Sequence, residues 1–599
     1  VFKTRKNGEI GKGVFMKKKV GIGVGVTAYV ILSLTICFGA FDSKEDNAVA
    51  DEAVETEHIE TESQDTKQDN RIFEQLDNRL EYAAADQKEL YVETDDLLVQ
   101  EEDKQNILTR YSLPVMERMS EDDASEKMTD LQVLRRIEKL GIDTEELYTP
   151  EYNWKATYDD SIANVDQAMQ LETEVEFDGT MASELNAFLQ EHTGEIIKVV
   201  SEAVTLDETI QVPSNVVLDG NGAVFQGDAG LTYAFLIENE QNIVMKNIVL
   251  DGGFEEGIYV IRSDHMLIYN NEITNAAYKA ICVMGTCQYI NIVNNSVHHN
   301  QNGAIFFNGD ISKCIIQGNA IYQNFGARNL TAGLVFSSME LDDIYTPYNE
   351  FKDIYLYDIL ESPNNNVIKD NLIQGNHSSG FYSDGGYQNY VINNVIEDNE
   401  KEGMCLDYGT FGTYVSANTV QRNGERNRQT DEDLEADFIL GLGRLADGSS
   451  TAKLPGISLD NAAYNLVCDN NINNNSGSGV KMVRSAYRNL IFSNQIADNN
   501  RGVNEAYHGF GIELGHASEP DEPVVGLDFT ADYENIVARN LISGAHFSGI
   551  YIAVDDYCND LIDNVIMDCT DFSVENYSDY YNSAVGNNTN VPTLNFPLQ

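Results

Sequence analysis

Basic residues are scarce in this sequence: 39 Lys and Arg stand against 97 Asp and Glu, for a formal net charge of −58 over 599 residues. Proteins that bind nucleic acid or the anionic face of a membrane do so through clustered Lys and Arg. The charge therefore excludes nucleic acid as a partner. It also weighs against a polyanionic substrate, unless a basic patch or bound calcium reverses the field locally.

Cysteine, proline and tryptophan are rare as well, with 8, 10 and 1 residues. The cysteines have neither the spacing of metal ligands nor the density of a disulfide scaffold. We expect seven of them to be buried as small apolar residues: Cys282, Cys287, Cys314, Cys405, Cys468, Cys558 and Cys569. The single tryptophan, Trp154, is expected to be a docking contact between domains rather than a platform for a sugar.

The N-terminal part of the chain differs in composition from the rest. Three lysines follow Met16 and precede an uncharged apolar stretch, which predicts that residues 16–41 form a signal peptide or an N-terminal anchor. The protein is then extracellular, either secreted or attached to a membrane or cell wall. Residues 42–70 are acidic and poor in large apolar residues, which predicts a linker. Apolar spacing of three and four predicts a small helical domain, which extends with its connector over residues 71–175.

A repeat of 23 or 24 residues dominates the remainder of the chain. An Asn followed two residues later by Ile or Val recurs at this spacing within each of several runs: Asn271, Asn295 and Asn319; Asn371, Asn394 and Asn418; Asn470 and Asn494; Asn540 and Asn564. Between these sites lie short runs whose apolar spacing is two, which excludes a helical solenoid. We predict an all-β right-handed parallel β-helix over residues 184–599, with one coil per repeat and stacked Asn side chains at the bends.

The predicted strands place carboxylates in one column. In strands that begin with Gly380, Gly403 and Gly456, the second and fourth residues face inward, so the third and fifth face outward. The fifth residues are Asp384, Asp407 and Asp460. Stacked coils lie about 4.8 Å apart, close to the separation of the two carboxylates in retaining glycosidases. The same strands and the next two strands place further polar residues at or beside outward positions near this column: Tyr382, Tyr408, Lys481, Arg484 and Glu513.

An insertion of about thirty residues interrupts the repeat between the second and third of these strands. It contributes further acids, including Asp431 and Asp437, with Arg428 beside them. Because insertions in solenoids gather on the binding face, one of these acids can complete the site. Two other interpretations of the column stay open: it binds calcium through hard oxygen ligands, or it is a solvated face of a very acidic protein.

The chain resembles the lacto-N-biosidases of glycoside hydrolase family 136. The resemblance lies in the two-part architecture and in the segments TEELYTPEYNW, SNVVLDGNGAVF, KEGMCLDYG, TDEDLEADF and LPGISLDNAAYN. Members of this family are secreted enzymes that couple an N-terminal helical domain to a right-handed β-helix. The resemblance implies a retaining enzyme that uses two aspartates to release lacto-N-biose from milk-type or mucin-type glycans. The helical domain is then needed for folding or for closing the site.

We therefore predict a secreted retaining glycoside hydrolase that acts on an oligosaccharide or polysaccharide. Asp407 and Asp460, or the loop acids Asp431 and Asp437, are the catalytic candidates. The substrate-binding candidates are Tyr382, Asp384, Tyr408, Arg428, Lys481, Arg484 and Glu513. The chemistry requires no cofactor, although calcium remains open. The alternatives are a polysaccharide lyase or epimerase, which would use Lys481 and Arg484, and a carbohydrate-binding surface protein without catalysis.

Overall fold

The computed structural model describes residues 130–594, except for gaps at 145–146, 148–149, 166–169, 228–229, 327–328, 339–360, 425–453, 501–508, 516–530, 545, 555 and 579–581. All of them belong to one compact unit, residues 71–599. The predicted signal segment, the acidic linker and residues 71–129 lie outside the described residues. Within the described part, no helix has the length and apolarity that crossing a membrane requires.

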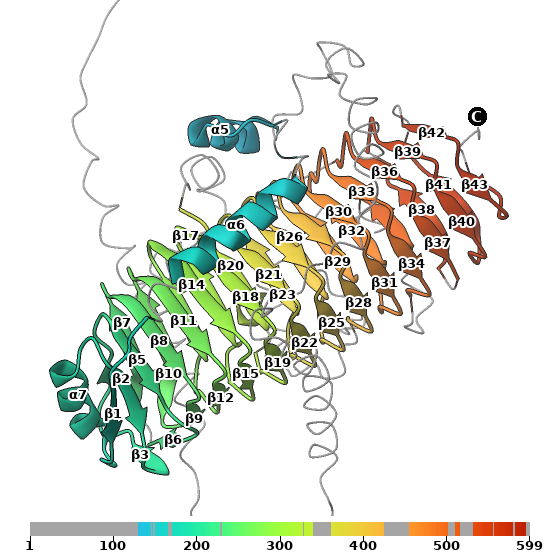
Figure 1. The fold of residues 1–599 in the computed structure, drawn as a ribbon. Helices are drawn as coiled ribbons and strands as arrows, with labels where there is room; N and C mark the ends of the chain where they lie inside the picture. Colours follow the sequence, from blue (N-terminus) through green and yellow to red (C-terminus); the bar gives the residue numbers. More distant parts are fainter. Residues whose placement is uncertain are drawn as a thin grey trace, which may run out of the picture. The chain divides into compact units, whose positions relative to one another are not determined.

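Three parallel sheets run along the solenoid, and neighbouring strands of a sheet come from successive coils (Figure 1). Sheet A contains β1 (Glu174–Phe177), β2 (Ile196–Val199), β5 (Val216–Asp219), β8 (Gln241–Lys246), β11 (Asp264–Tyr269), β14 (Cys287–Val293), β17 (Ile311–Ser312), β18 (Ile315–Gln317), β21 (Val367–Lys369), β24 (Tyr390–Ile392), β27 (Tyr414–Ser416), β30 (Leu466–Cys468), β33 (Leu490–Phe492), β36 (Ile536–Ala538), β39 (Asp560–Ile562) and β42 (Ser583–Val585). Sheet B contains β3 (Ala203–Thr205), β6 (Val224–Gln226), β9 (Val249–Asp251), β12 (Glu272–Thr274), β15 (Ser296–His298), β19 (Ala320–Tyr322), β22 (Leu372–Gln374), β25 (Val395–Glu397), β28 (Thr419–Gln421), β31 (Asn471–Asn473), β34 (Gln495–Ala497), β37 (Leu541–Ser543), β40 (Val565–Met567) and β43 (Asn588–Thr589).

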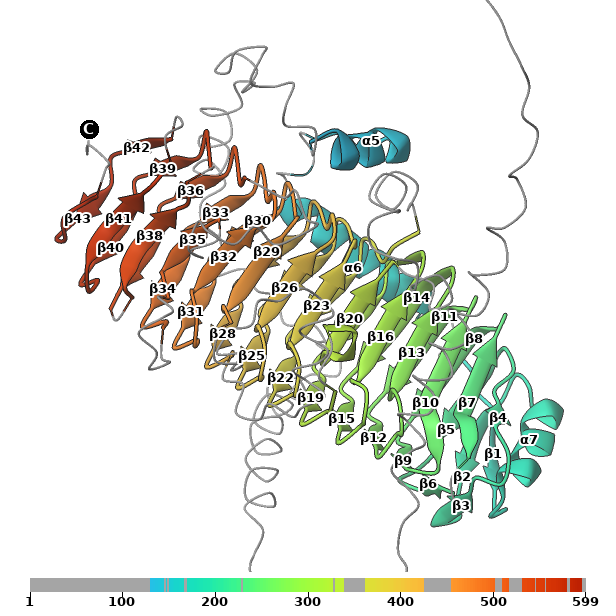
Figure 2. The same cartoon turned by 180° about the vertical axis from the view of Figure 1, so that it is seen from behind.

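Sheet C carries the predicted carboxylate column and is seen from its outer side in Figure 2. It contains β4 (Ile210–Gln211), β7 (Leu231–Glu238), β10 (Phe254–Ile261), β13 (Ile281–Met284), β16 (Ile305–Asn308), β20 (Leu334–Ser337), β23 (Phe381–Asp384), β26 (Met404–Asp407), β29 (Ile457–Asp460), β32 (Val480–Val483), β35 (Ile512–Leu514), β38 (Ser548–Ile552) and β41 (Phe572–Asn576). The short 3-10 helix η4 (Asn329–Thr331) precedes β20.

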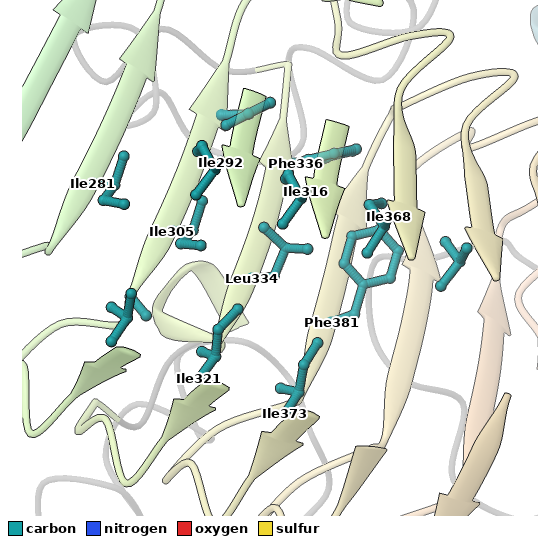
Figure 3. Close-up of a cluster of buried hydrophobic side chains, with 14 of the residues drawn as sticks. Ile281, Ile292, Ile305, Ile316, Ile321, Leu334, Phe336, Ile368, Ile373 and Phe381 are labelled. Atoms are coloured by element: carbon teal, nitrogen blue, oxygen red, sulfur yellow. The ribbon is translucent and has the colours of Figure 1, made fainter. Parts of the chain in front are cut away.

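Inward-facing apolar side chains from the three sheets meet in a single core that runs along the solenoid (Figure 3). In β16, for example, Ile305 and Phe307 belong to this core. Alternation along each strand therefore separates core residues from outward residues, as the predicted period of two requires. All seven cysteines of the described residues are buried and free of disulfide bonds, which confirms that prediction.

Stacked asparagines hold the bends between sheets A and B. Asn394 illustrates the arrangement: its Oδ1 accepts hydrogen bonds from the backbone N–H and the Nδ2 of Asn371, and its Nδ2 donates to Oδ1 of Asn418. The residue before it, Asn393, adopts a left-handed backbone with a φ of 53°, which Asn tolerates better than most residues. The predicted ladder is therefore present. Two further ladders pass through Asn399 and Asn489 at the other bends.

The solenoid begins earlier than predicted. Strand β1 lies ahead of residue 184 and pairs in parallel with β2, which follows it. Residue 184 itself lies in helix α7 (Ala182–Glu191). Three buried residues of α7 join the core, including Leu185 and Leu189. Because an open end of a β-helix exposes apolar side chains, α7 serves as the N-terminal cap. A helix rather than a strand therefore occupies the predicted starting point.

Helices α5 (Asp130–Leu140) and α6 (Pro150–Val165) lie against the solenoid rather than forming a core of their own. Figure 1 shows α6 across sheet A, where Tyr158 donates a hydrogen bond to Gln317 and Ser161 to Asn291. Trp154 is half-buried and packs with Tyr158 in the cluster on this outer face. The tryptophan is therefore a docking contact, as predicted.

Candidate functional site

The three predicted aspartates lie on neighbouring strands of sheet C. Asp384, Asp407 and Asp460 are the last residues of β23, β26 and β29. Asp384 pairs in register with Asp407, and the residues just before Asp407 and Asp460 pair with each other. The residues that alternate with them, such as Leu406 and Leu459, point into the core. The predicted register is therefore confirmed, with the carboxylates directed away from the core.

These carboxylates are much less exposed than a solvated face would be. The exposed fractions of Asp384, Asp407 and Asp460 are 2%, 3% and 7%. The bordering residues Lys481 and Arg484 retain 21% and 31% of their side-chain exposure. The aspartates themselves are therefore not a solvated face. Because these acids are buried, the general acidity of the protein surface does not explain them.

Helix α5 brings a guanidinium group to this cluster. Arg136 is 2% exposed and donates hydrogen bonds to the carbonyl oxygens of Gly409 and Gly385 and to Ser362 Oγ. Burial raises the pKa of Asp384 to about 7, and the charge of Arg136 opposes this rise. No pattern in the sequence pointed to this residue, because it lies in the helical segment far from the repeat.

Asp407 is held by two donors. The hydroxyl group of Tyr382 donates to Oδ2 at 2.9 Å, and the backbone N–H of Tyr408 donates to Oδ1 at 2.8 Å. Tyr382 is only 2% exposed, so in this structure it is a buried hydrogen-bond donor to Asp407. Tyr408 is half-buried and has a φ of 45°. The same left-handed backbone recurs at other bends of the solenoid, for example at Tyr289 and Tyr464.

The two basic residues predicted for substrate binding each contact an acid. Arg484 Nη2 lies 3.2 Å from Asp460 Oδ2, and Lys481 Nζ lies 2.9 Å from Glu513 Oε1. Glu513 also accepts a hydrogen bond from Ser478. Oδ1 of Asp460 is buried and has no hydrogen-bond partner among the residues that the structure describes. One oxygen of Asp460 is therefore neutralised by a cation while the other is available.

The surroundings separate the acidities of Asp407 and Asp460. Burial, together with the negative charge of Asp460, raises the pKa of Asp407 well above its usual range. Burial also raises the pKa of Asp460, but Arg484 opposes this, and the value is about 6. Burial and the charge of Asp460 thus favour the protonated form of Asp407, whereas Arg484 favours the ionised form of Asp460. Two adjacent carboxyl groups with divergent acidities are the arrangement that acid and nucleophile roles require.

A further acid was missed by the sequence analysis. Asp532 is buried and accepts hydrogen bonds from the backbone N–H groups of Ala486 and Gly515. Burial raises its pKa to about 7, and the charge of Asp460 adds to the rise. Its hydrogen bonds tie the segment that precedes β36 to the turns that follow β32 and β35, so its main role is structural. A repeat signal was present, since an Asp followed by Tyr recurs 24 residues later at Asp556, whose Oδ1 accepts a hydrogen bond from the backbone N–H of Asp532.

The pKa of Asp384 predicts a pH-dependent stability. Burial raises this pKa from 3.8 to about 7, although Arg136 and Ser337 lower it. The folded carboxyl group binds its proton more tightly, so its contribution to stability is complete below pH 4 and is lost as the pH rises through 7. Asp384→Asn should therefore stabilise the protein by about 4 kcal/mol more at pH 8 than at pH 4, measured by urea unfolding. Equal effects at both pH values would contradict this. Asp398→Asn, a like change at a turn residue that is 38% exposed, is the control.

Three predicted residues belong to a segment that the structure does not describe. Asp431, Asp437 and Arg428 are outside the described residues. In the part of the chain that the structure describes, no group of three or more His, Cys, Asp or Glu side chains is arranged to hold a metal ion. A calcium site in the column remains an untested prediction.

Comparisons with known proteins agree on the architecture. Residues 233–420 match the family model described as right handed beta helix region, and residues 359–519 match the one described as periplasmic copper-binding protein (NosD). With the three parallel sheets, the first match defines the chain as a right-handed parallel β-helix protein, as predicted. No curated protein matches the sequence.

Several solved structures are similar to this chain at low sequence identity and with TM-scores below 0.5. The A-module of the mannuronan C-5 epimerase AlgE4 of Azotobacter vinelandii is 13% identical, with 72% of this chain and 99% of that chain covered and a TM-score of 0.39. The periplasmic alginate epimerase AlgG is 11% identical, with coverages of 70% and 85% and a TM-score of 0.34. A DFA-IIIase from Arthrobacter chlorophenolicus A6 is 13% identical, with coverages of 61% and 66% and a TM-score of 0.31.

Proposed function

We propose that this β-helix protein is a retaining glycoside hydrolase, with Asp460 as the nucleophile and Asp407 as the acid and base. One observation carries the proposal: two buried carboxyl groups end adjacent strands, and among the described residues only the one of Asp460 is paired with a cation. The spacing between coils is about 4.8 Å. Retaining enzymes hold their two carboxyl groups about 5 to 5.5 Å apart, whereas inverting enzymes need room for a water molecule.

The proposed reaction has two displacements. Asp460 attacks the anomeric carbon through its unpartnered Oδ1 while Asp407 gives its proton to the departing glycosidic oxygen, which leaves a glycosyl ester on Asp460. Asp407, now ionised, takes a proton from a water molecule that attacks the same carbon and releases Asp460. Arg484 balances the charge of Asp460 before and after the ester forms, and Tyr382 orients Asp407.

The substrate class follows from the resemblance to the lacto-N-biosidases and is part of the proposal. We expect the protein to release lacto-N-biose from milk-type or mucin-type oligosaccharides, outside the cell. Glu513 and Lys481 neutralise each other, so together they suit the hydroxyl groups of a neutral sugar better than a uronate carboxylate.

A glycan screen tests the function. Purified full-length protein is incubated with milk-type, mucin-type and plant oligosaccharides, and released sugars are identified by mass. Proton NMR during the first turnovers then reports the anomer of the product, which should have the configuration of the substrate. Initial release of the opposite anomer would contradict the assigned mechanism. An unsaturated product that absorbs in the near ultraviolet would instead identify a lyase, and binding without cleavage would identify a carbohydrate-binding protein.

A further inference from the structure

The aspartate column is part of a longer file of polar side chains. The last residues of five neighbouring strands of sheet C form what we call the strand-end file: Asn308, Ser337, Asp384, Asp407 and Asp460. The next strand on one side ends in Met284, in register with Asn308, and the next on the other side ends in Val483, in register with Asp460. The file thus has apolar residues at both ends, and the catalytic pair occupies its C-terminal end.

Asn308 is an unusual member of this file. It is 2% exposed, and within the described part of the chain neither its amide oxygen nor its amide nitrogen has a hydrogen-bond partner. Because Phe307 points into the core, Asn308 points outward, like the aspartates. A buried polar group without a partner costs about 1–3 kcal/mol. A structural role gives no reason for this cost, since an apolar residue of the same size would avoid it.

The neighbouring positions provide further hydrogen-bonding capacity. Ser337 lies between Asn308 and Asp384 in the register and donates a hydrogen bond to Asp384. Oδ1 of Asp384 is buried and, like the Asn308 amide, has no partner. Three hydrogen-bonding atoms of two side chains are therefore unused at the N-terminal end of the file.

An apolar row runs beside these polar residues. Phe306, Val335 and Tyr382 occupy outward positions of the same three strands and pack in one cluster on the outer side of sheet C. A sugar ring presents hydroxyl groups at its edge and C–H groups on its faces. A polar file beside an apolar row matches both kinds of surface.

We propose that Asn308, Ser337 and Asp384 form a subsite for a sugar ring of the substrate that lies beyond the cleaved linkage. This inference rests on the proposed function and extends it to substrate length. Three coil spacings separate Asn308 from Asp407, or roughly 14 Å, which exceeds one sugar ring. The protein therefore selects oligosaccharides that are long enough to reach Asn308, and a ligand reaches this buried amide only if the surrounding chain moves.

Asn308→Leu tests the subsite because it replaces the amide with an apolar group of similar size. Binding is measured by titration calorimetry in the Asp407→Asn protein, with lacto-N-biose and with the tetrasaccharide and hexasaccharide that contain it. We expect the affinity for one or both longer sugars to fall about tenfold or more with Asn308→Leu, while the affinity for lacto-N-biose stays the same. The unfolding midpoint should stay equal or rise, because an unpaired amide has been removed.

Thr413→Val is the matched control, since the Thr413 hydroxyl group is also buried without a partner but lies outside sheet C, just before β27. Unchanged affinity for both longer sugars would overturn the subsite, as would an equal loss for all three sugars or no binding of any sugar. If the wild-type protein cleaves no glycan but Asn308→Leu still weakens binding of the longer sugars, the subsite stands and the proposed hydrolase function fails.

Discussion

Asp407→Asn and Asp460→Asn should each reduce glycan hydrolysis by about a thousandfold or more, while leaving the fold intact. Asparagine has nearly the shape of aspartate but neither gives a proton nor forms a stable glycosyl ester. Each catalytic group in such a pair contributes on this scale. The measurement is kcat/KM on the glycan identified by the screen, with circular dichroism as a check on folding.

The control for this experiment is Asp398→Asn. Asp398 pairs with Arg422 at an exposed turn beyond sheet B, so the variant loses one carboxylate without touching the site and should keep wild-type activity. If either Asp407→Asn or Asp460→Asn also keeps wild-type activity, that aspartate is not catalytic.

Azide distinguishes the two roles. With Asp460→Ala, azide can take the place of the nucleophile and form a glycosyl azide with inverted configuration. With Asp407→Ala, azide attacks the glycosyl ester on Asp460 and the product keeps its configuration. If Asp460→Ala gave the azide with kept configuration and Asp407→Ala gave the inverted one, the roles of the two aspartates would be reversed.

The pH dependence of the wild-type protein provides an independent check of the same pair. Because the nucleophile must be ionised, activity should fall as the pH drops below about 6, the pKa of Asp460. Activity should fall again at a higher pH at which Asp407 loses its proton, since burial and Asp460 raise its pKa. A profile that stays flat down to pH 4 would contradict an ionised Asp460 as the nucleophile.

Asn394→Ala should destabilise the protein by about 3–5 kcal/mol, the largest stability effect expected for a single polar side chain. Nδ2 of Asn394 donates to Asn418 and to the carbonyl oxygens of Ile368 and Ile392. Its Oδ1 accepts two hydrogen bonds from Asn371. Alanine removes all five and leaves buried groups without partners, at about 1 kcal/mol or more each.

The neighbouring residue provides a matched control. Asn393→Gly alters an adjacent asparagine whose left-handed backbone suits glycine, so the cost should stay below about 1 kcal/mol. Unfolding in urea, followed by circular dichroism, measures both variants. Similar midpoints for Asn394→Ala and Asn393→Gly would show that stacked asparagines are not what stabilises the bends.

Local sequence patterns were sufficient to predict the solenoid fold and the column of outward aspartates. The spacing of Asn271, Asn295 and Asn319 predicted the coils, because each coil repeats the same bend at the same place. The alternation within GMCLDYG and GISLDNA predicted that Asp407 and Asp460 face away from the core, because side chains in a strand alternate between faces. The other two ladders carried a similar signal, at Asn300 and Asn324 and at Asn366 and Asn389.

Burial, partners and acidities came from packing between segments distant in sequence. Arg136 reaches Gly385 and Gly409 only because α5 docks on the solenoid, and no repeat includes it. Tyr382 is a buried donor to Asp407 because its outward position is covered. Period and strand register are local properties and can be inferred from the order of residues. The exposure and charge of a side chain depend on what packs against it, and only the tertiary structure decides that.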